Sequence, residues 1–571
     1  MSVNQPKQGH PKGLYILFAT EMWERFNYYG MRAVLVLFMT KALLFDKAFA
    51  SNLYGSYTSL VYLTPLIGGF IADKYWGNQR SIIAGGLVMA IGEILLFFCG
   101  QTYISAPGLS TMFFFAGLGL MIAGNGFFKP NISSLVGQLY IKGDRRVDSA
   151  YTIFYMGINV GGALGPFICG LVGDTGHPGD FKWAFLAGAI GMLTSVVVQL
   201  AFAKQYVIDP NKNVLGRPPV GAHAFWSKPF FVILGLAAFA TLAIGMLYVD
   251  AKVLVFLPYL LLLATVLIVG IILTDKSLTK TEKQRVSVIF IVAFFVIFFW
   301  SAFEQAGASL TFFADEQTNR HLGFVIPTWI IYPLGVAALI AIFKLFKTAK
   351  ISLGSAEDTK LRSTVYVLLS AFALAILYGT ISVMNGGKQQ FSLDELPAST
   401  FQSLNSVFVV SFAPLFAWLW LKLGKYEPAA PTKMAIGLFL LSLGYLWIAF
   451  GVKDVAPGIK VSMIWLIGMY ALHTWGELCL SPIGLSLVNK MSPIKFGSLL
   501  MAVWFLANSF ANYLAGTLSS LYPDKKPTSF LGYTMTNLYD FFILFVVMAG
   551  IASLILFGLS RQLQKLMNGV K

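Results

Sequence analysis

Charged side chains recur at helical spacing in the first apolar segment of this sequence, where lipid would not tolerate them. Four polar residues follow steps of four, three and four positions: Glu21, Arg25, Tyr28 and Arg32. This spacing places them along one face of a helix, with Glu24 and Tyr29 at its flanks. An ionised side chain at mid-bilayer costs about 2.5–3.5 kcal/mol even on the lenient translocon scale. We therefore expect this face to meet partner charges or a water-filled cavity.

Three further charges interrupt apolar segments elsewhere in the chain: Lys129, Glu304 and Glu477. A cavity that collects acidic and basic groups from both halves of the chain suits a zwitterion, and carboxylates that change protonation suit coupling to a proton gradient. The alternative for any single residue is a structural ion pair that joins helices. Glu93 differs, because its local sequence AIGEILL has no cavity-facing pattern. The two alternatives for Glu93 are a residue that packs between helices and a residue that lines the pore.

The elements that must position these residues are long apolar segments. Of the 571 residues, 57% are hydrophobic and 12% are charged, against roughly 25% charged in a soluble domain. Segments of about 20 residues are long enough to cross the hydrocarbon core. We predict an all-α polytopic membrane protein with twelve core helices, at 14–44, 51–73, 81–100, 108–138, 149–173, 181–203, 286–314, 399–423, 431–452, 461–489, 496–520 and 537–560. Two extra helical hairpins are predicted at 229–249 with 253–274, and at 325–343 with 363–384.

The distribution of basic residues predicts the orientation of these helices. The net charge is +16, and with the N-terminus inside, the internal loops and tails hold most of the 41 Lys and Arg residues. This asymmetry fits the positive-inside rule and makes nucleic-acid binding the weaker reading. We expect a multi-pass membrane protein with both termini cytoplasmic. The polar first 13 residues lead into a helix that lacks a cleavage pattern, so the first helix should be retained.

Several chemistries are not indicated by the sequence. The three cysteines, Cys99, Cys169 and Cys479, lie in apolar segments without paired spacing and are expected to be buried packing residues. The five histidines have no ligand spacing, so no metal site is expected. HExxH, GxSxG and the GxxxxGK[ST] phosphate loop are absent, which disfavours a membrane-embedded enzyme and ATP-driven pumping. We expect no cofactor, with protons as the coupling ion.

The polar stretch 204–228 is the natural linker between two halves of the chain. The expected division is an N-terminal six-helix bundle at 1–205, a cytoplasmic linker with an inserted transmembrane hairpin at 206–285, and a C-terminal six-helix bundle at 286–571 that contains the second hairpin at about 325–396.

The loop after the second predicted helix resembles the GxxxDRxGxR(R/K) signature of the major facilitator superfamily. The resemblance is carried by Gly69, Asp73, Lys74, Gly77 and Arg80. It implies two six-helix bundles, and a gating role for Asp73 and Arg80 in latching the cytoplasmic side. The alternative is a helix stop with charges that anchor it inside. A degenerate copy, APLFAWLWLKLGKYEP, occupies the matching place in the second half, as expected of parallel repeats.

Longer motifs resemble the proton-dependent oligopeptide transporter family, in particular its bacterial members. EMWERFNYYG, starting at Glu21, is similar to the family motif ExxERFxYYG. GFFKPN at 126–131 and FYMGIN at 154–159 are similar to its two signature stretches, and FQSLN at 401–405 and Gly476-Glu477 match in the second half. The resemblance covers nearly all of the twelve-helix core. It implies a symporter that imports di- and tripeptides with protons across the bacterial inner (cytoplasmic) membrane by alternating access.

The resemblance also implies a role for individual residues. Arg25 and Lys129 would hold the peptide carboxylate, and Glu477 its amino terminus. The other implied substrate-binding residues are Tyr29, Tyr62, Asn159, Trp300, Asn405 and Trp504. The implied proton-coupling residues are Glu21, Glu24 and Glu304. The implied gates are an Arg32–Glu304 pair towards the outside and a Lys129–Glu477 pair across the halves.

Two features depart from the family pattern, and two other functions stay open. The hairpin at 325–384 looks like an insertion, whose default role is packing at the lipid-facing edge, with dimer contact and regulation as the alternatives. Phe303 stands where some members carry a second carboxylate. A proton-coupled carrier of nitrate or another small anion is the first alternative, although an anion would not need the negative pole of Glu477. The second is a peptide sensor that does not transport. The expected partners are di- and tripeptides, protons and membrane lipid, without nucleic acid.

Overall fold

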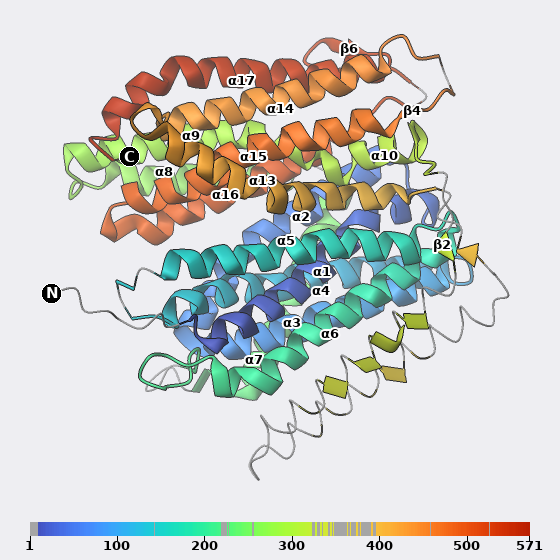
Figure 1. Cartoon of the computed structure of the whole chain (residues 1–571), viewed down its shortest axis with the longest axis horizontal. Helices are drawn as coiled ribbons and strands as arrows, with labels where there is room; N and C mark the ends of the chain where they lie inside the picture. The colour runs from blue at the N-terminus through green and yellow to red at the C-terminus, as the bar shows by residue number, and fades with distance from the viewer. Residues whose placement is uncertain are drawn as a thin grey trace.

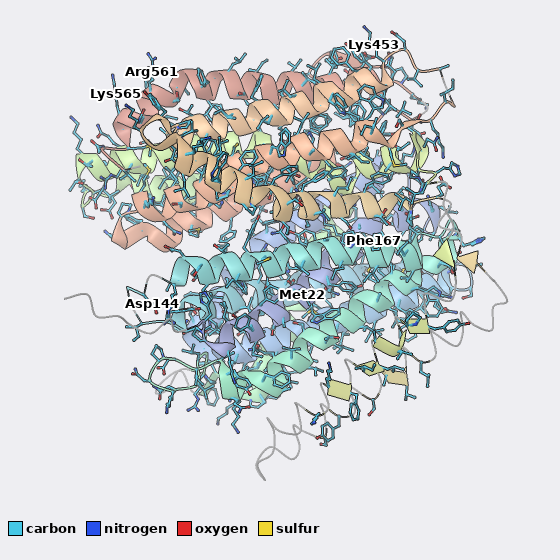
Figure 2. The ribbon with its side chains drawn as sticks, in the orientation of Figure 1. Met22, Asp144, Phe167, Lys453, Arg561 and Lys565 are labelled. Atoms are coloured by element: carbon cyan, nitrogen blue, oxygen red, sulfur yellow. The ribbon has the colours of Figure 1, made fainter. Side chains whose placement is uncertain are left out.

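The computed structural model is almost entirely helical, with the helices running roughly parallel to one long direction (Figure 1). It describes residues 9–218 except 142 and 145, residues 225–322 except 227, 254 and 255, and residues 395–570 except 457 and 525, with short stretches between 326 and 391. Both chain ends lie at the same end of the molecule, which we call the terminus side; the opposite end is the far side. Asp144, Arg561 and Lys565 mark the terminus side and Lys453 the far side (Figure 2).

The first six core helices pack against one another on one side of the molecule. They are α1 (Lys12–Lys41), α2 (Lys47–Ile71), α3 (Asn78–Thr102), α4 (Pro107–Gln138), α5 (Val147–Gly173) and α6 (Phe181–Tyr206). A π-helical turn, η1 (Ala72–Trp76), follows α2, and a 3-10 turn, η2 (Pro178–Asp180), precedes α6. α1 packs on α5 and α6, and α3 on α4 and α6.

Small residues allow α1 and α5 to approach closely. A Cβ atom on Gly161 would lie 2.2 Å from the Met22 carbonyl oxygen, and one on Gly165 would lie 2.4 Å from that of Phe26. Those separations are too short for any side chain, so the backbone of α5 lies directly against α1. This close contact helps to set the rotation of the helix that carries the charged face.

The second set of core helices packs on the other side of the molecule. The long elements are α9 (Lys280–Phe303), α13 (Ser403–Leu423), α14 (Ala430–Val452), α15 (Met463–Met491), α16 (Gly497–Ser519) and α17 (Leu538–Leu566). Short helices join or extend them: η4 (Glu304–Gly307), α10 (Ser309–Glu316), η7 (Ala398–Gln402), η8 (Gly424–Tyr426) and η9 (Ile494–Phe496). The strands pair as β1 (Thr318–Asn319) with β4 (Val461–Ser462), β2 (Ile326–Pro327) with β3 (Gln390–Phe391), and β5 (Thr528–Phe530) with β6 (Tyr533–Met535).

An extra hairpin contacts both sets of core helices. It consists of α7 (Pro229–Val253) and α8 (Phe256–Thr274). α7 packs on α2 and α4, while α8 packs on α16. Just after α8, Asp275 forms an ion pair with Lys495 at 2.6 Å. Hydrogen bonds from Lys495 and Ser277 hold the pKa of the Asp275 carboxyl at about 2, so this pair is ionised at any pH at which the protein works.

The positions of the helices agree closely with the sequence prediction. The predicted helices outside the second hairpin each coincide with an observed helix within a few residues. The second hairpin at 325–384 lies largely outside the described residues. Where the structure is described, eleven helices are apolar and long enough to span a membrane, and α1 is not among them because its charged face lowers its hydropathy.

One predicted helix is interrupted. The segment predicted at 286–314 lies in one candidate span, Lys280–Glu316, but within it α9 gives way at Glu304 to η4 and then to α10. Gly307 sits at this break, and a Cβ atom there would lie 1.7 Å from the Tyr54 hydroxyl. The close approach of Tyr54 from α2 accompanies the altered backbone, which a hydrophobic pattern alone does not reveal. The domain boundaries stay a prediction.

Contacts between the two sets come from the far-side parts of their helices. The Ser59 and Ser509 hydroxyls lie 2.8 Å apart between α2 and α16, and Gly55 packs against Gly516 one to two turns further out. Ser403 at the start of α13 donates to the Ala163 carbonyl of α5 at 2.7 Å. Ridges of small residues thus bring the two sets together at this end.

Candidate functional site

The centre of the charged face is an ion-paired cluster on α1. The Arg25 Nε atom lies 2.9 Å from Glu21 Oε1 and 2.6 Å from Glu24 Oε2. The Asn125 amide of α4 donates to the second oxygen of Glu24 at 3.1 Å. All of these side chains are buried. One guanidinium therefore serves two carboxylates, which leaves a net negative charge that a cation or a proton can offset.

Lys129 lies close to this cluster without joining it. Its ammonium sits over the Tyr62 ring, 4.5 Å from the ring centre. Glu24, Glu21 and Arg25 all act electrostatically on it. In the part of the chain that the structure describes, Lys129 has no ion-pair partner. A half-buried cation held over a π face is available for an anionic ligand.

The second cluster joins the two sets of helices. Arg32 on α1 forms an ion pair with Glu304 at 2.7 Å, and both side chains are buried. The rings of Tyr29 and Tyr54 flank the Arg32 guanidinium at 5.6 and 6.0 Å. Since Glu304 lies at the break after α9, the break itself directs this carboxylate towards α1. The predicted Arg32–Glu304 pair is thus present as a contact.

The negative group of the second set is Glu477 on α15. Its Oε2 atom accepts a hydrogen bond from the Asn405 amide of α13 at 2.8 Å, and Asn405 also donates to Thr474 at 3.2 Å. Tyr29 lies between the two sets of helices, near enough to both Arg25 and Glu477 for each to act on it electrostatically. Among the described residues, Lys129 and Glu477 form no ion pair with each other, so the second predicted gate pair is not formed in this conformation.

A small cavity lies beside Arg32 and Asn405. It is lined by residues from both sets of helices, namely Tyr29, Arg32, Gly162, Pro166, Phe303, Ala306, Gln402, Asn405, Ser406, Tyr470 and His473. Its volume is about 30 Å³, which holds a water or two but no peptide. The far-side wall of the site is therefore closed around the Arg32–Glu304 pair.

The remaining predicted residues fall into two groups. Asn159 donates to the Tyr155 carbonyl at 3.0 Å, and Trp300 packs against Phe303. Trp504 is buried, and its ring packs directly against the backbone of Gly484 on α15. Asp73 and Arg80 are exposed at the terminus side, in η1 and the first turn of α3, and lie apart from the charged clusters. The structure brings the charged residues and Tyr29, Tyr62 and Asn405 together, but it does not bring Asp73 and Arg80 to them.

Several residues of the site were missed from the sequence. Asn125 stands four positions before Lys129 on α4, so helical spacing alone could have indicated a shared face. Gln402, Tyr470 and His473 line the cavity, but the types of these residues do not by themselves show that they face a cavity. Their position is decided by how α13 and α15 pack on α1 and α9.

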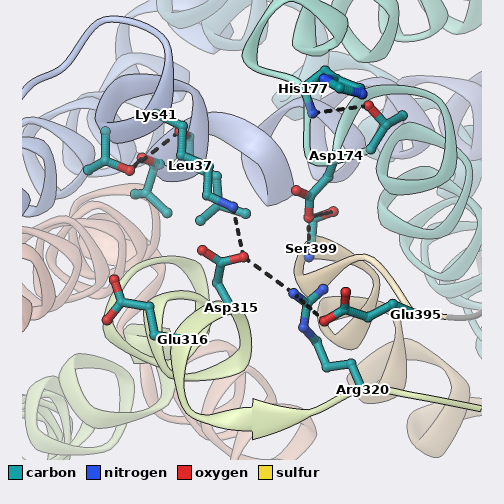
Figure 3. A network of polar contacts seen from close by, with 12 residues as sticks. Leu37, Lys41, Asp174, His177, Asp315, Glu316, Arg320, Glu395 and Ser399 are labelled. Carbon is teal, nitrogen blue, oxygen red and sulfur yellow. Dashed lines mark hydrogen bonds and ion pairs between the residues drawn. The ribbon is translucent and has the colours of Figure 1, made fainter. Parts of the chain in front are cut away.

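A polar network closes the far side (Figure 3). Lys41 at the end of α1 pairs with Asp315 of α10 at 2.7 Å, and Arg320 pairs with Glu395 at 3.1 Å. Lys47 at the start of α2 also pairs with Glu316 at 2.6 Å. The Lys41 and Lys47 pairs join the N-terminal set to the C-terminal set at the far side.

Asp174 makes the most specific contact of this network. It follows α5, and its Oδ2 atom accepts hydrogen bonds from both the backbone N–H and the hydroxyl of Ser399, each at 3.1 Å. Ser399 lies in the first turn of η7, whose free N–H groups need acceptors. Burial raises the pKa of the Asp174 carboxyl, and Lys41 opposes that shift. One set of helices therefore caps a helix of the other.

The same interface is exposed nearer the terminus side. Tyr151 and Tyr155 on α5 are 42% and 40% exposed, and Leu415 and Trp418 on α13 are 52% and 53% exposed. At the far end of the same two helices, Ser403 of α13 contacts Ala163 of α5, whereas these four side chains further along are exposed. Apolar side chains at such positions are covered when the helices approach along their full length. The conformation is therefore closed on the far side and separated towards the terminus side.

Comparison with known proteins places this architecture among transporters. The POT family model matches residues 79–355 and 364–534. The chain is 33% identical to the uncharacterized transporter YclF of Bacillus subtilis, over 92% of this chain and 90% of that protein. It is 30% identical to the peptide transporter YePEPT of Yersinia enterocolitica, over 89% and 88%. A crystal structure of a mutant peptide transporter POT in complex with alafosfalin superimposes with a TM-score of 0.72 at 28% identity, covering 99% of this chain and 97% of that one.

Proposed function

Because the chain belongs to the POT family and has the major facilitator superfamily fold, we propose that it is a symporter that imports di- and tripeptides with protons. The observation that carries the proposal is that buried groups of opposite charge come from the two sets of helices. Arg25 and Lys129 come from one set of helices, and Glu477 comes from the other. A zwitterion with separated termini complements these poles, with its carboxylate at the cations and its ammonium at Glu477.

Uncharged groups around the poles would complete the peptide site. Asn405 already donates to Glu477, so it would orient that carboxylate towards the ammonium. Asn159, close to Tyr155 on α5, would hydrogen-bond the peptide backbone. Tyr29, Tyr62, Trp300 and Trp504 would line side-chain pockets, since aromatic faces accept side chains of many shapes.

The shared guanidinium of Arg25 supplies a reason for coupling. Arg25 contacts both Glu21 and Glu24. When a peptide carboxylate takes Arg25, these buried carboxylates lose their counter-charge, and an unpaired buried carboxylate is neutralised by a proton. Peptide and proton binding then favour each other, as linkage requires of a symporter. Glu304 would provide a further proton site, because protonation releases Arg32.

Transport would follow from rocking of the two sets about the site. We assign the terminus side to the cytoplasm, in line with the basic loops of the sequence, so the conformation described above faces inward. Opening to the outside would break the Arg32–Glu304 pair and the Asp174–Ser399 contact. Closing the inside would bring Lys129 towards Glu477, with Asp73 and Arg80 latching the loop after α2.

The direct test of the function is uptake into proteoliposomes with an imposed pH gradient. We expect labelled di- and tripeptides to accumulate against their gradient when the outside is acidic, and a protonophore to abolish the accumulation. Nitrate is added as a competitor in a parallel arm. Nitrate accumulation that dipeptides do not inhibit would favour the anion carrier. Peptide binding without either uptake or counterflow would favour the sensor.

Asp174→Ala is expected to favour the outward-facing conformation. The change removes two hydrogen bonds to a charged group, each worth about 1.5–3 kcal/mol, so the outward population should rise at least tenfold. Spin labels at Ile104 and Lys453, both near the far side, report it as a longer distance between the sets.

Asp180→Ala is the matched control for this measurement. Asp180 is an acidic residue of the same loop, but its carboxylate bonds to Thr175 within the loop. We expect its distance distribution to equal that of the unmodified chain. An equal shift in both variants would show that the loop, and not the contact to Ser399, sets the balance.

A further inference from the structure

Glu93 is a buried carboxyl group that the proposed mechanism does not use. It lies on α3 and is 0% exposed. Its Oε1 atom accepts a hydrogen bond of 2.8 Å from the Asn27 amide of α1, which is also 0% exposed. Two atoms of this pair, Glu93 Oε2 and Asn27 Oδ1, have no hydrogen-bond partner among the described residues. If Glu93 is ionised, the pair makes one hydrogen bond and leaves one oxygen atom of each side chain without a partner.

The surroundings of Glu93 offer no counter-charge. The groups that face it from neighbouring helices are Asn27 on α1, Tyr57 on α2 and Cys169 on α5. On the α6 side lies Gly188, where a Cβ atom would be 3.0 Å from Glu93 Oε1. Within the described residues, Glu93 takes part in no ion pair, in contrast to Glu21, Glu24 and Glu304. An isolated carboxylate in such a place is strongly disfavoured over the neutral acid.

The neutral acid also completes the hydrogen bonding. A carboxylic acid has one O–H donor and one carbonyl acceptor, and an Asn amide has the same complement in reverse. With Asn27 Nδ2 donating to Oε1, the two unpartnered atoms are the acceptor of Asn27 and the oxygen of Glu93 that would bear the proton. A small side-chain rotation lets that O–H donate to Asn27 Oδ1. An ionised Glu93 has no donor for Asn27.

The pair holds α1 by the face opposite to Arg25. Asn27 is two residues after Arg25, about 200° around a helix. Holding Asn27 against α3 and α6 therefore turns Arg25 away from those two helices. Close packing supports the same rotation, since Gly188 and Gly191 on α6 leave room for the Glu93–Asn27 pair and the Phe26 ring.

We propose that Glu93 stays protonated through the transport cycle and acts as a positioning residue, pairing with Asn27 as acid and amide to orient α1 and its charged cluster. This inference rests on the proposed function for its transport readout. It gives two buried carboxyls different roles: Glu24 exchanges a proton, and Glu93 keeps one.

The test is a comparison of Glu93→Gln with Glu93→Leu. A Gln side chain reproduces the neutral acid, since its carbonyl accepts from Asn27 and its amide donates to Asn27 Oδ1. We expect Glu93→Gln to retain accumulation and its pH profile within about twofold of the unmodified chain. Glu93→Leu leaves both polar groups of Asn27 unpaired and should lower accumulation and counterflow together, on the order of tenfold.

A double variant guards against a general folding defect. Glu93→Gln with Asn27→Asp exchanges acid and amide across the same contact, and we expect it to transport like the unmodified chain. If Glu93→Gln instead loses accumulation but keeps counterflow, Glu93 is a coupling carboxylate and the proposal fails. Wild-type transport by Glu93→Leu would also overturn it.

Infrared spectroscopy supplies a readout that does not depend on transport. The unmodified protein should show a carbonyl stretch of a protonated carboxyl that is absent in Glu93→Gln and does not titrate across the working pH range. A band that titrates, or no such difference band, contradicts permanent protonation. If the protein does not carry peptides at all, this measurement still decides the state of Glu93, so the two failures are distinguishable.

Discussion

Glu24→Gln is expected to abolish proton-driven accumulation of peptide while part of the counterflow activity remains. Glu24 is 0% exposed and contacts Arg25 at 2.6 Å, so the amide removes the protonation change while it keeps the shape. Without that change, peptide binding no longer draws a proton into the site, and the accumulation ratio falls to about one. Counterflow needs only the exchange of labelled and unlabelled peptide, which leaves no net proton movement.

The two activities are measured in the same proteoliposomes, with and without the pH gradient. Glu21→Gln should behave in the same way, because Glu21 is the second carboxylate on Arg25. Glu282→Gln is the control: Glu282 completes the cap at the start of α9, and Gln serves equally well there. Uphill uptake that is unchanged in both the Glu21 and the Glu24 variant would remove the coupling role of this cluster.

Lys129→Ala is expected to weaken peptide binding on the order of 10- to 100-fold. The residue rests on Tyr62 and forms no ion pair among the described residues, so its removal leaves no buried carboxylate without a partner. A lost charge-assisted hydrogen bond to the peptide carboxylate accounts for about 1.5–3 kcal/mol, which is the stated change in affinity. Competition binding with a dipeptide and with its C-terminal amide measures it, since the amide lacks the anionic group and should bind both proteins weakly.

Lys182→Ala is the matched control for this substitution. Lys182 also lies over an aromatic ring, that of Trp183 at 5.3 Å, but on the far-side surface of α6. Arg25→Ala should cripple uptake as well, although it strands Glu21 and Glu24 and so combines lost binding with a destabilised site. Wild-type affinity in both the Lys129 and the Arg25 variant would remove the assignment of the carboxylate pole.

Much of this protein follows from its sequence alone. The lengths of the apolar segments predicted the helices, because a segment that crosses a bilayer must form its backbone hydrogen bonds within itself. The charged face of α1 was equally visible, since ionised groups in an apolar helix are too costly to be incidental. The motifs around Arg25, Lys129 and Glu477 then indicated the family that the comparison identifies.

Tertiary structure decided which of these charges meet. Arg32 and Glu304 are distant in the chain, and their contact depends on a helix break that the hydrophobic pattern conceals. Asp174 reads as an ordinary loop residue until η7 of the other set lies against it. Glu93 gave no pattern because Asn27, its hydrogen-bond partner among the described residues, is on another helix. Sequence determines where a charge must be satisfied, whereas helix packing over long separations determines which group satisfies it.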